Sequence, residues 1–263
     1  MSIYDIPTVW LFFIFTFIIV LISVLGLFLL KKVNTKSVKC EDHNTIIAIL
    51  IGVMSVFLGV MVSFLILTSW GIYSKASLDV QKEAQSIGIL FEVISTLPNT
   101  EKTQALIIAY LNYIINVEFP AIKEGQLPPE GEAFTEEIQR LLYDYIPEGA
   151  QETVLYQRSI QLIDVIIDLR INRISIATSG LNQLIWWVSI IDSVLIIVMS
   201  YFLNCNRLFH YLVIIVIAIY VAVGLFTTLV LSNPFRGSNG ISSQAYQNTL
   251  NYILPINTEI IGE

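Results

Sequence analysis

The fold is decided by the stretch TIIAILIGVMSVFLGVMVSFLILTSW, residues Thr45–Trp70. It carries no charge and exceeds the roughly 20 residues that a helix needs to cross the hydrocarbon layer of a bilayer. Similar stretches lie at about Val9–Leu30, Leu184–Leu203 and Tyr211–Leu231, and only one of the four holds a charged residue, Asp192. The chain is therefore predicted to be an integral membrane protein with four spans in two pairs.

The spans divide the chain into four expected parts. These are a first transmembrane pair in 1–70, with helices at about 9–30 and 45–70; an acidic helical extramembrane domain in 71–182; a second pair in 183–231, with helices at about 184–203 and 211–231; and a C-terminal segment, 232–263, with a short amphipathic helix. The lipid bilayer is the partner that these apolar stretches imply, and we expect a bacterial inner or plasma membrane.

Charge is scarce and unevenly placed along the chain. Charged residues make up 13% of the sequence and hydrophobic residues 55%, whereas soluble domains average about 25% charged residues. Residues 71–182 contain 15 acidic and 8 basic side chains, which accounts for the whole net charge of −7. Because phosphate backbones are bound by basic surfaces, nucleic acid is excluded as a partner.

The apolar pattern of the second span continues beyond Trp70 at spacings of three and four, which is typical of one helix face. The residues are Tyr73, Ala76, Val80, Ala84, Ile87 and Phe91. This pattern predicts one continuous helix from about Thr45 to Ser95, which leaves the bilayer and enters the middle segment.

Further helices are predicted in the middle segment at 100–118, ended by Pro120, at 135–145, ended by Pro147, and at 151–178, which is expected to run on into the third span. The predicted buried faces are Leu106, Ala109, Tyr110, Tyr113, Ile114 and Val117 in the first of these, and Leu155, Ile160, Ile163, Ile167, Ile171 and Ile174 in the last. The expected fold is all-α, with a helical extramembrane bundle formed by extensions of the second and third transmembrane helices.

The orientation follows from the lysines of the first loop, which are Lys31, Lys32, Lys36 and Lys39. Lysine-rich loops stay in the cytoplasm, so the N-terminus, residues 71–182 and the C-terminus are expected to be extracytoplasmic. Basic residues that flank the other ends of the spans oppose this orientation; they are Lys75, Lys82, Arg170, Arg173 and Arg236.

An ordered set of short motifs accompanies the two helix pairs. It comprises His43-Asn44 at the start of the second span, Glu83-Ala84 on its extension, Tyr110, Glu118-Phe119-Pro120, and Asn233-Pro234-Phe235-Arg236-Gly237 after the fourth span. With this set the chain resembles, over essentially its whole length, the bestrophin-like family of multi-span membrane proteins. That pattern commonly has tryptophan where this chain has Phe119. The resemblance implies a distant relation to bestrophins, which are pentameric anion channels with a cytoplasmic helical part.

Asp192 is expected near the centre of the third span, where a carboxyl group costs about 2.5–3.5 kcal/mol on insertion scales. Such residues face a bundle interior or a wet cavity, so Asp192 is a candidate cation site, proton site or gate. The alternative is a protonated or hydrogen-bonded residue that fixes helix packing. Its available partners are Ser23, Ser55, Ser63, Tyr220 and Thr227.

Small residues form one face of the second span, at Ala48, Gly52, Ser55, Gly59 and Ser63. Small residues let helices approach closely in lipid, where apolar bulk gives no preference. This face is expected either to pack against a helix of the same subunit or to line a pore in an oligomer.

Cysteine and histidine occur only in or beside the two short loops, at Cys40, His43, Cys205 and His210. Their spacings are compatible with a tetrahedral Zn²⁺ site. The simpler interpretation is that the cysteines are reduced and that His43 hydrogen-bonds the start of the second helix, with Asn44 as its N-cap. We therefore predict no metal and no cofactor.

The acidic motif residues outside the membrane are expected to be structural. Glu83 and Glu118 are predicted to face each other or to pair with Arg170 and Arg173. Paired carboxylates also serve in acid–base catalysis, but no nearby histidine, nucleophile motif or phosphate loop accompanies them, so no enzyme is predicted.

The motif after the fourth span is expected to mark the membrane boundary. Pro234 ends the helix, Phe235 lies at the interface, and Arg236, followed by Gly237, reaches lipid phosphate or helix-end carbonyl groups. The alternative role for Arg236 is to attract anions to a pore mouth.

Two functions remain. The first is a homo-oligomeric, channel-like membrane protein that forms a permeation pathway for an inorganic ion. The second is a non-enzymatic, membrane-anchored structural, sensing or assembly protein whose helical domain binds a partner. If the acidic segment 71–182 formed a vestibule it would attract cations rather than anions, contrary to what the resemblance implies.

Overall fold

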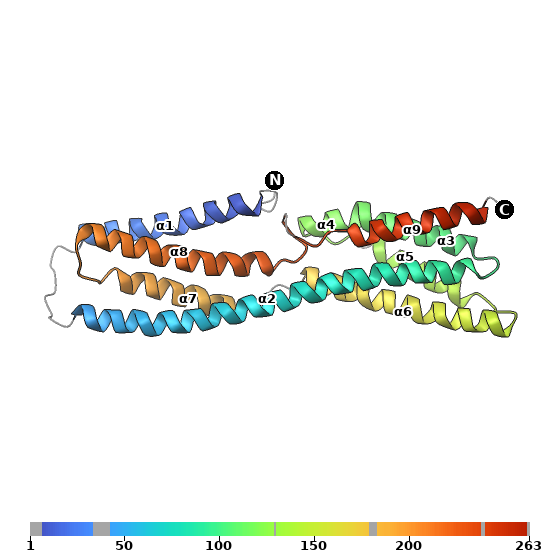
Figure 1. The fold of residues 1–263 in the computed structure, drawn as a ribbon, viewed down its shortest axis with the longest axis horizontal. Coiled ribbons are helices and arrows are strands. Elements are labelled where there is room, and N and C mark those ends of the chain that lie inside the picture. Colours follow the sequence, from blue (N-terminus) through green and yellow to red (C-terminus); the bar gives the residue numbers. More distant parts are fainter. Residues whose placement is uncertain (1–6, 34–42, 129, 179–182, 238–239, 262–263) are drawn as a thin grey trace. The chain divides into compact units, whose positions relative to one another are not determined.

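The computed structural model describes residues 7–33, 43–128, 130–178, 183–237 and 240–261, and within these ranges the chain forms helices and turns without any strand. The helices fall into two compact units. One comprises residues 1–73 and 180–233, and the other residues 74–179 and 234–263. We call them the membrane unit and the extramembrane unit, and Figure 1 labels their helices.

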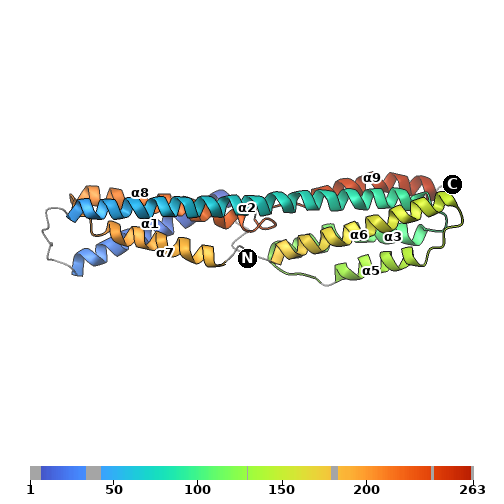
Figure 2. The same ribbon diagram turned by 90° about the horizontal axis from the view of Figure 1, so that it is seen from below.

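The membrane unit consists of α1 (Thr8–Val33), the first part of α2 (His43–Ser95), α7 (Gln183–Ser200) and α8 (Arg207–Leu231). α1 and α8 run alongside each other in both views (Figures 1 and 2). The buried core is made by Leu58, Ile196, Val221 and Leu225. Many large apolar side chains of α1 and of the first part of α2 are exposed, as expected where lipid rather than water surrounds a helix.

Four stretches among the described helices are long and apolar enough to cross a membrane: Thr8–Lys31, Asn44–Ser95, Glu101–Glu124 and Arg207–Leu231. The remaining predicted span is α7, whose apolar part is the shorter stretch Trp186–Ser200. We assign Glu101–Glu124 to the extramembrane unit, because it packs against α5 and α9 and its interior residue Glu118 is ion-paired. The four predicted transmembrane helices are therefore α1, α2, α7 and α8.

Polar contacts tie the turn between α7 and α8 to the other helices of the membrane unit. The Tyr201 hydroxyl donates to the Ser23 carbonyl at 2.8 Å, and it lies so close to Gly26 that a Cβ there would be 2.5 Å away. The Asn44 side chain donates to the Asn204 carbonyl at 2.7 Å and accepts from the Asn204 N–H at 2.8 Å. Asn44 therefore lies in the first turn of α2 and binds this turn, instead of acting as the expected N-cap.

The extramembrane unit combines the rest of α2 with α3 (Glu101–Tyr113), the π-helix η2 (Ile114–Glu118), α4 (Phe119–Glu124), α5 (Glu130–Tyr143), α6 (Ala150–Thr178) and α9 (Gln244–Ile261). The predicted continuation of the second helix to Ser95 is confirmed, and with it the all-α fold. The predicted join between α6 and the third span falls on residues 179–182, which lie outside the described residues.

The prediction that Pro120 ends its helix is wrong. Proline has no N–H and its ring crowds the carbonyl four residues back, so a regular α-helix cannot continue through it unchanged. Here the backbone widens into η2, in which the Phe119 N–H donates to the Ile114 carbonyl, five residues back. Helix resumes in α4, with Pro120 in its first turn, and ends at Gly125 with φ +80°.

The predicted buried faces of α3 and α6 are partly wrong. Tyr110 is buried as expected, but Val117 is 45% exposed. In α6 the difference is larger, because Ile171 is 57% exposed whereas Arg170 and Arg173 are 7% and 0% exposed. Apolar periodicity misses this face because two of its buried positions are held by charges.

The motif after α8 packs into the extramembrane unit. Phe235, expected at the membrane interface, is buried with its ring edge-on to Phe119 at a centroid distance of 6.1 Å. The Ile241 N–H donates to the Pro234 carbonyl at 2.8 Å and closes the loop. The Arg236 guanidinium lies against Gly125, where a side chain would collide with it.

Candidate functional site

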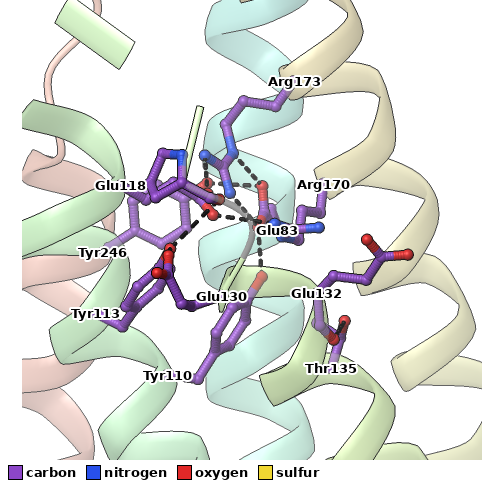
Figure 3. Close-up of polar contacts among 11 residues, drawn as sticks. Glu83, Tyr110, Tyr113, Glu118, Glu130, Glu132, Thr135, Arg170, Arg173 and Tyr246 are labelled. Atoms are coloured by element: carbon purple, nitrogen blue, oxygen red, sulfur yellow. Dashed lines mark hydrogen bonds and ion pairs between the residues drawn. The ribbon is translucent and has the colours of Figure 1, made fainter. Parts of the chain in front are cut away.

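The interior of the extramembrane unit holds four charged side chains in mutual contact, which we call the ion-pair cluster: Glu83, Glu118, Arg170 and Arg173 (Figure 3). Arg173 binds Glu83 through two bonds, from Nε to Oε2 at 2.8 Å and from Nη2 to Oε1 at 3.0 Å. This two-point geometry is the strongest arrangement of an arginine and a carboxylate. Neither side chain is exposed to solvent.

Glu118 connects the two arginines. Its Oε1 lies 2.6 Å from Arg173 Nη1, and its Oε2 accepts from Arg170 Nη2 at 3.1 Å. The arginines are one turn apart on α6, so they share a helix face. Glu118 is the last residue of η2, so the π-turn fixes the helical register from which its carboxylate meets them.

Aromatic residues complete the surroundings of Glu83 and Arg173. The Tyr246 hydroxyl of α9 donates to Glu83 Oε2 at 2.7 Å, and the Tyr110 hydroxyl donates to Oε1 at 3.3 Å. The rings of Phe119 and Tyr246 lie 5.4 and 5.7 Å from the Arg173 guanidinium carbon, within cation–π range. The cluster thus joins α2, α6, α9 and the segment from α3 to α4.

The electrostatics of the cluster are balanced, with two negative and two positive charges. Burial is the largest single effect on the pKa of Arg173 and lowers it, because it favours the neutral form. Glu83, Tyr246 and Glu118 together outweigh burial and raise the pKa of Arg173 well above its ordinary value. Burial and the charge of Glu83 raise the pKa of Tyr246, against the opposing effect of Arg173. Arg173 is therefore charged and Tyr246 neutral at any physiological pH.

Gly131 permits the cluster to form beside the first turn of α5. A Cβ at this position would collide with Glu118 Oε2 and would lie 2.5 Å from Arg170 Nη2. The carboxylate of Glu118 thereby approaches the N-terminal turn of α5, where negative charge is favoured by the helix dipole. No sequence pattern had singled out this glycine.

Asp79 is a buried acidic residue on the same helix as Glu83, and no ion pair involves it among the described residues. Asp79 lies one turn before Glu83 on α2, is 7% exposed, and has its Oδ2 buried with no hydrogen-bond partner. Asp79, like Glu83, lies directly before an apolar position of the pattern that continues the second span, Val80 and Ala84 respectively.

In the membrane unit, Asp192 is 7% exposed and its Oδ2 is likewise buried without a hydrogen-bond partner. Several hydroxyls considered as partners are donated to their own helix: Ser23 to the Ile19 carbonyl, Ser63 to Gly59, and Thr227 to Val223. Among the described residues, none makes a hydrogen bond or ion pair with Asp192.

The small-residue face of α2 is largely open within the chain. A Cβ at Gly52 would meet no atom within 4 Å, and Ser63 is exposed. Gly59 has one close neighbour, the Tyr220 hydroxyl, 3.6 Å from its Cβ position. The close approach of α8 to α2 occurs instead at Gly224, where a Cβ would lie 3.0 Å from the Val62 side chain.

Of the four candidate metal ligands, only His210 and Cys205 have described side chains. His210 Nε2 lies 3.0 Å from the Ser200 carbonyl, and Cys205 is a free thiol. Cys40 is outside the described residues, and for His43 only the backbone is described. Within the described ranges no group of three potential ligands occurs.

Sequence reasoning found the acidic and basic members of the cluster but missed Tyr246 and Gly131. Tyr246 lies in the C-terminal segment, for which only a short amphipathic helix was predicted, and only the fold shows that this residue meets Glu83. The ion pairs of the cluster link α2, η2 and α6, so its geometry suits holding these helices together.

Comparison with known proteins gives a consistent result. The Bestrophin-like domain matches residues 17–246 of this chain. Among curated proteins there is no match.

Solved structures share the fold. A bacterial Bestrophin homolog from Klebsiella pneumoniae, carrying one substitution, aligns with a TM-score of 0.69 and 12% identity, covering 94% of this chain and 98% of that chain. The same homolog with a different substitution aligns with a TM-score of 0.68 and 10% identity, covering 92% of this chain and 98% of that chain. The crystal structure of a substituted membrane protein aligns with a TM-score of 0.67 and 12% identity, covering 94% of this chain and 98% of that chain. At such low identity, the likeness is one of fold.

Proposed function

This chain belongs to the Bestrophin-like family, and from that premise we propose that it assembles as a homo-oligomer in the membrane and forms an ion permeation pathway. The proposed role is non-enzymatic and uses no cofactor. The resemblance to bestrophins motivates the channel-like role, and the geometry of the membrane unit supports it.

The observation that carries the proposal is the open small-residue face of α2. A Cβ at Gly52 would meet no atom of another helix within 4 Å among the described residues, and Ser63 is exposed although the surrounding side chains are large and apolar. Glycine and serine faces in membrane helices allow close approach of another helix or of a polar path. Because the chain does not fill this face itself, a second copy or an axial pathway is its proposed neighbour.

The charge of the extramembrane unit supports a preference for cations. The ion-pair cluster removes two charges of each sign from the surface, so the net charge of −7 in residues 71–182 is carried by the other side chains. An acidic vestibule raises the local concentration of cations and lowers that of anions. We propose cation preference, in contrast to the anion channels that the resemblance implies.

The proposed orientation places the lysine-rich first loop in the cytoplasm. The hydrogen bonds between Asn44 and Asn204 support the placement of both short loops on the same side, since they hold the start of α2 next to the turn between α7 and α8. Both short loops are then on one side, and the N-terminus, residues 71–182 and the C-terminus are proposed to be extracytoplasmic.

Cysteine crosslinking tests the assembly. In a background with Cys40 and Cys205 changed to Ser, Gly52→Cys and Gly59→Cys are expected to form disulfide-linked dimers in membranes on mild oxidation. Val53→Cys, which lies on a different face of the helix, is the control. Absence of crosslinks at Gly52 and Gly59, together with a monomeric mass in detergent, would favour the alternative role of a membrane-anchored assembly protein.

Ion flux tests the pathway. Purified protein in liposomes with asymmetric salt is expected to conduct, with a reversal potential displaced toward the cation equilibrium potential. A displacement toward the anion potential would contradict cation preference but keep the pathway. Sealed liposomes with a correctly assembled oligomer would contradict the pathway itself.

A further inference from the structure

The polar interior of the membrane unit centres on Asp192, in the middle of α7. Its side chain is more than nine-tenths buried in a single chain, and its Oδ2 has no hydrogen-bond partner. One turn earlier on the same face, Ser189 is also fully buried, and its Oγ is unpaired as well. Two unpaired oxygens therefore share one buried face of a helix inside the membrane.

Among the side chains that the structure describes, no basic group forms an ion pair with Asp192. α7 packs against α8, and Ile196, one turn after Asp192, joins a core with residues of α1, α2 and α8. The titratable side chains described on these parts are Lys31, Tyr73, Arg207, His210, Tyr211 and Tyr220, and none of them bonds to Asp192. The basic ones lie in the first or last turns of their helices, with Lys31 over the Tyr211 ring at 5.2 Å.

An ionised carboxylate without donors is strongly disfavoured in such a place, because nothing replaces the water it has lost. A neutral carboxyl group needs only one acceptor for its O–H, and the unpaired Ser189 Oγ on the same face is of the required kind. A metal ion needs several ligands, and among the described residues Asp192 belongs to no group of three His, Cys, Asp or Glu side chains. The chemistry present suits a proton.

We propose that Asp192 is a proton-binding site in the interior of the membrane unit, and that gain and loss of this proton changes ion flux through the protein. Proton binding stands independently of the proposed permeation pathway, whereas the effect on flux rests on it. Ionisation would place an unpaired charge among Ser189, Ile196 and the core of α2 and α8, so the packing of these helices is expected to differ between the two forms.

Infrared difference spectroscopy of the full-length protein in lipid bilayers tests proton binding directly. At neutral pH the wild type is expected to show the C=O band of a protonated carboxyl group that disappears at alkaline pH. The band is expected to be lost in Asp192→Asn and displaced in Asp192→Glu. Asp164→Asn, which removes an exposed aspartate of α6, is the matched control and is expected to retain it.

Identical spectra for wild type and Asp192→Asn would overturn the proposal. Asp192→Glu and Ser189→Ala give independent readings. Each keeps a carboxyl group and is expected to shift the band, and an unshifted band in both would count equally against the assignment.

Flux measurements in liposomes at a series of pH values test the regulatory part. The wild type is expected to show a pH-dependent flux, and Asp192→Asn a flux that is flat over the same range. A pH profile unchanged by Asp192→Asn would overturn the regulatory link. A titrating carboxyl band without flux in any variant would instead support proton binding and reject the permeation pathway.

Discussion

The two units of the molecule bury polar groups in opposite ways. In the extramembrane unit, carboxylates and guanidinium groups from distant segments meet in the ion-pair cluster, and two tyrosines donate to it. In the membrane unit, hydroxyl groups donate mostly to their own helix, and Asp192 Oδ2 is left without a partner. In the extramembrane unit, the buried oxygens Asp79 Oδ2 and Glu118 Oε1 also lack a hydrogen bond, but Glu118 Oε1 is ion-paired with Arg173.

The difference follows from the two solvents. In lipid, the backbone N–H and C=O groups of a chain bond to each other within each helix, and serine and threonine hydroxyls likewise donate to carbonyls of their own helix. A unit surrounded by water tolerates charges in its interior only when they are paired, and pairing across segments specifies one arrangement of the helices. The extramembrane unit is therefore expected to be sensitive to the loss of single polar groups, and the membrane unit to be tolerant of it.

The largest expected effect is that of Arg173→Met, which leaves two carboxylates buried without their main counter-charge. We expect a loss of about 3–5 kcal/mol in the free energy of unfolding. The measurement is denaturant unfolding in detergent followed by circular dichroism. Arg158→Met, at an exposed position of the same helix, is the control and is expected to change stability by less than about 0.5 kcal/mol. Equal effects of the two variants would show that the cluster contributes no special stability.

The second effect concerns Tyr246→Phe, which removes the hydroxyl that donates to Glu83. A hydrogen bond to a charged group contributes about 1.5–3 kcal/mol, so Tyr246→Phe is expected to lower the free energy of unfolding by this amount near neutral pH. Because burial, with the charge of Glu83, raises the pKa of Tyr246, the folded protein holds the phenolic proton more tightly than the unfolded chain. This contribution is intact below pH about 10 and is lost as pH rises above it.

The difference in unfolding free energy between wild type and Tyr246→Phe should therefore shrink above that pH. Tyr252→Phe, whose partner Glu92 is at the surface, is the matched control and should change stability less. A constant difference across the whole alkaline range would argue against a buried, neutral Tyr246.

A third variant tests the close packing beside the cluster. Gly131→Ala introduces a methyl group against Glu118 and Arg170, and overpacking of this kind typically costs about 1–3 kcal/mol. Gly71→Ala, where a Cβ meets no atom within 4 Å, is the control and is expected to be slightly stabilising, because alanine favours a helix over glycine by about 0.8–1 kcal/mol. Thermal unfolding of both variants would distinguish steric conflict from a general effect of removing glycine.

The smallest effect is expected for Asp192→Asn in the membrane unit. If Asp192 is neutral, asparagine is a replacement of the same size and charge, and the free energy of unfolding should change by less than about 1 kcal/mol. Glu83→Gln, the same change in the extramembrane unit, should cost several times more because it disrupts a paired charge. Similar losses for both variants would erase the contrast between the units.

Parts of the structure were predictable because they depend on local patterns. The apolar run of Thr45–Trp70 and the spacing beyond it are sufficient to predict α2 to Ser95. The buried positions Ala76, Val80 and Ala84 follow from the same periodicity. Pro120 was misjudged because a π-turn absorbs the missing N–H, and nothing local distinguishes such a turn from a helix end.

The sequence by itself determined the helices, the four spans and the scarcity of charge, since these depend on hydrophobicity and on spacing along one segment. Only the tertiary structure decided which polar groups are paired. The sequence offered Arg170 and Arg173 as possible partners of Glu83 and Glu118, but only the fold shows which arginine binds which carboxylate. Tyr246 reaches Glu83 from a segment 163 residues away. Pairing depends on where distant helices meet, and that information is absent from any single stretch of sequence.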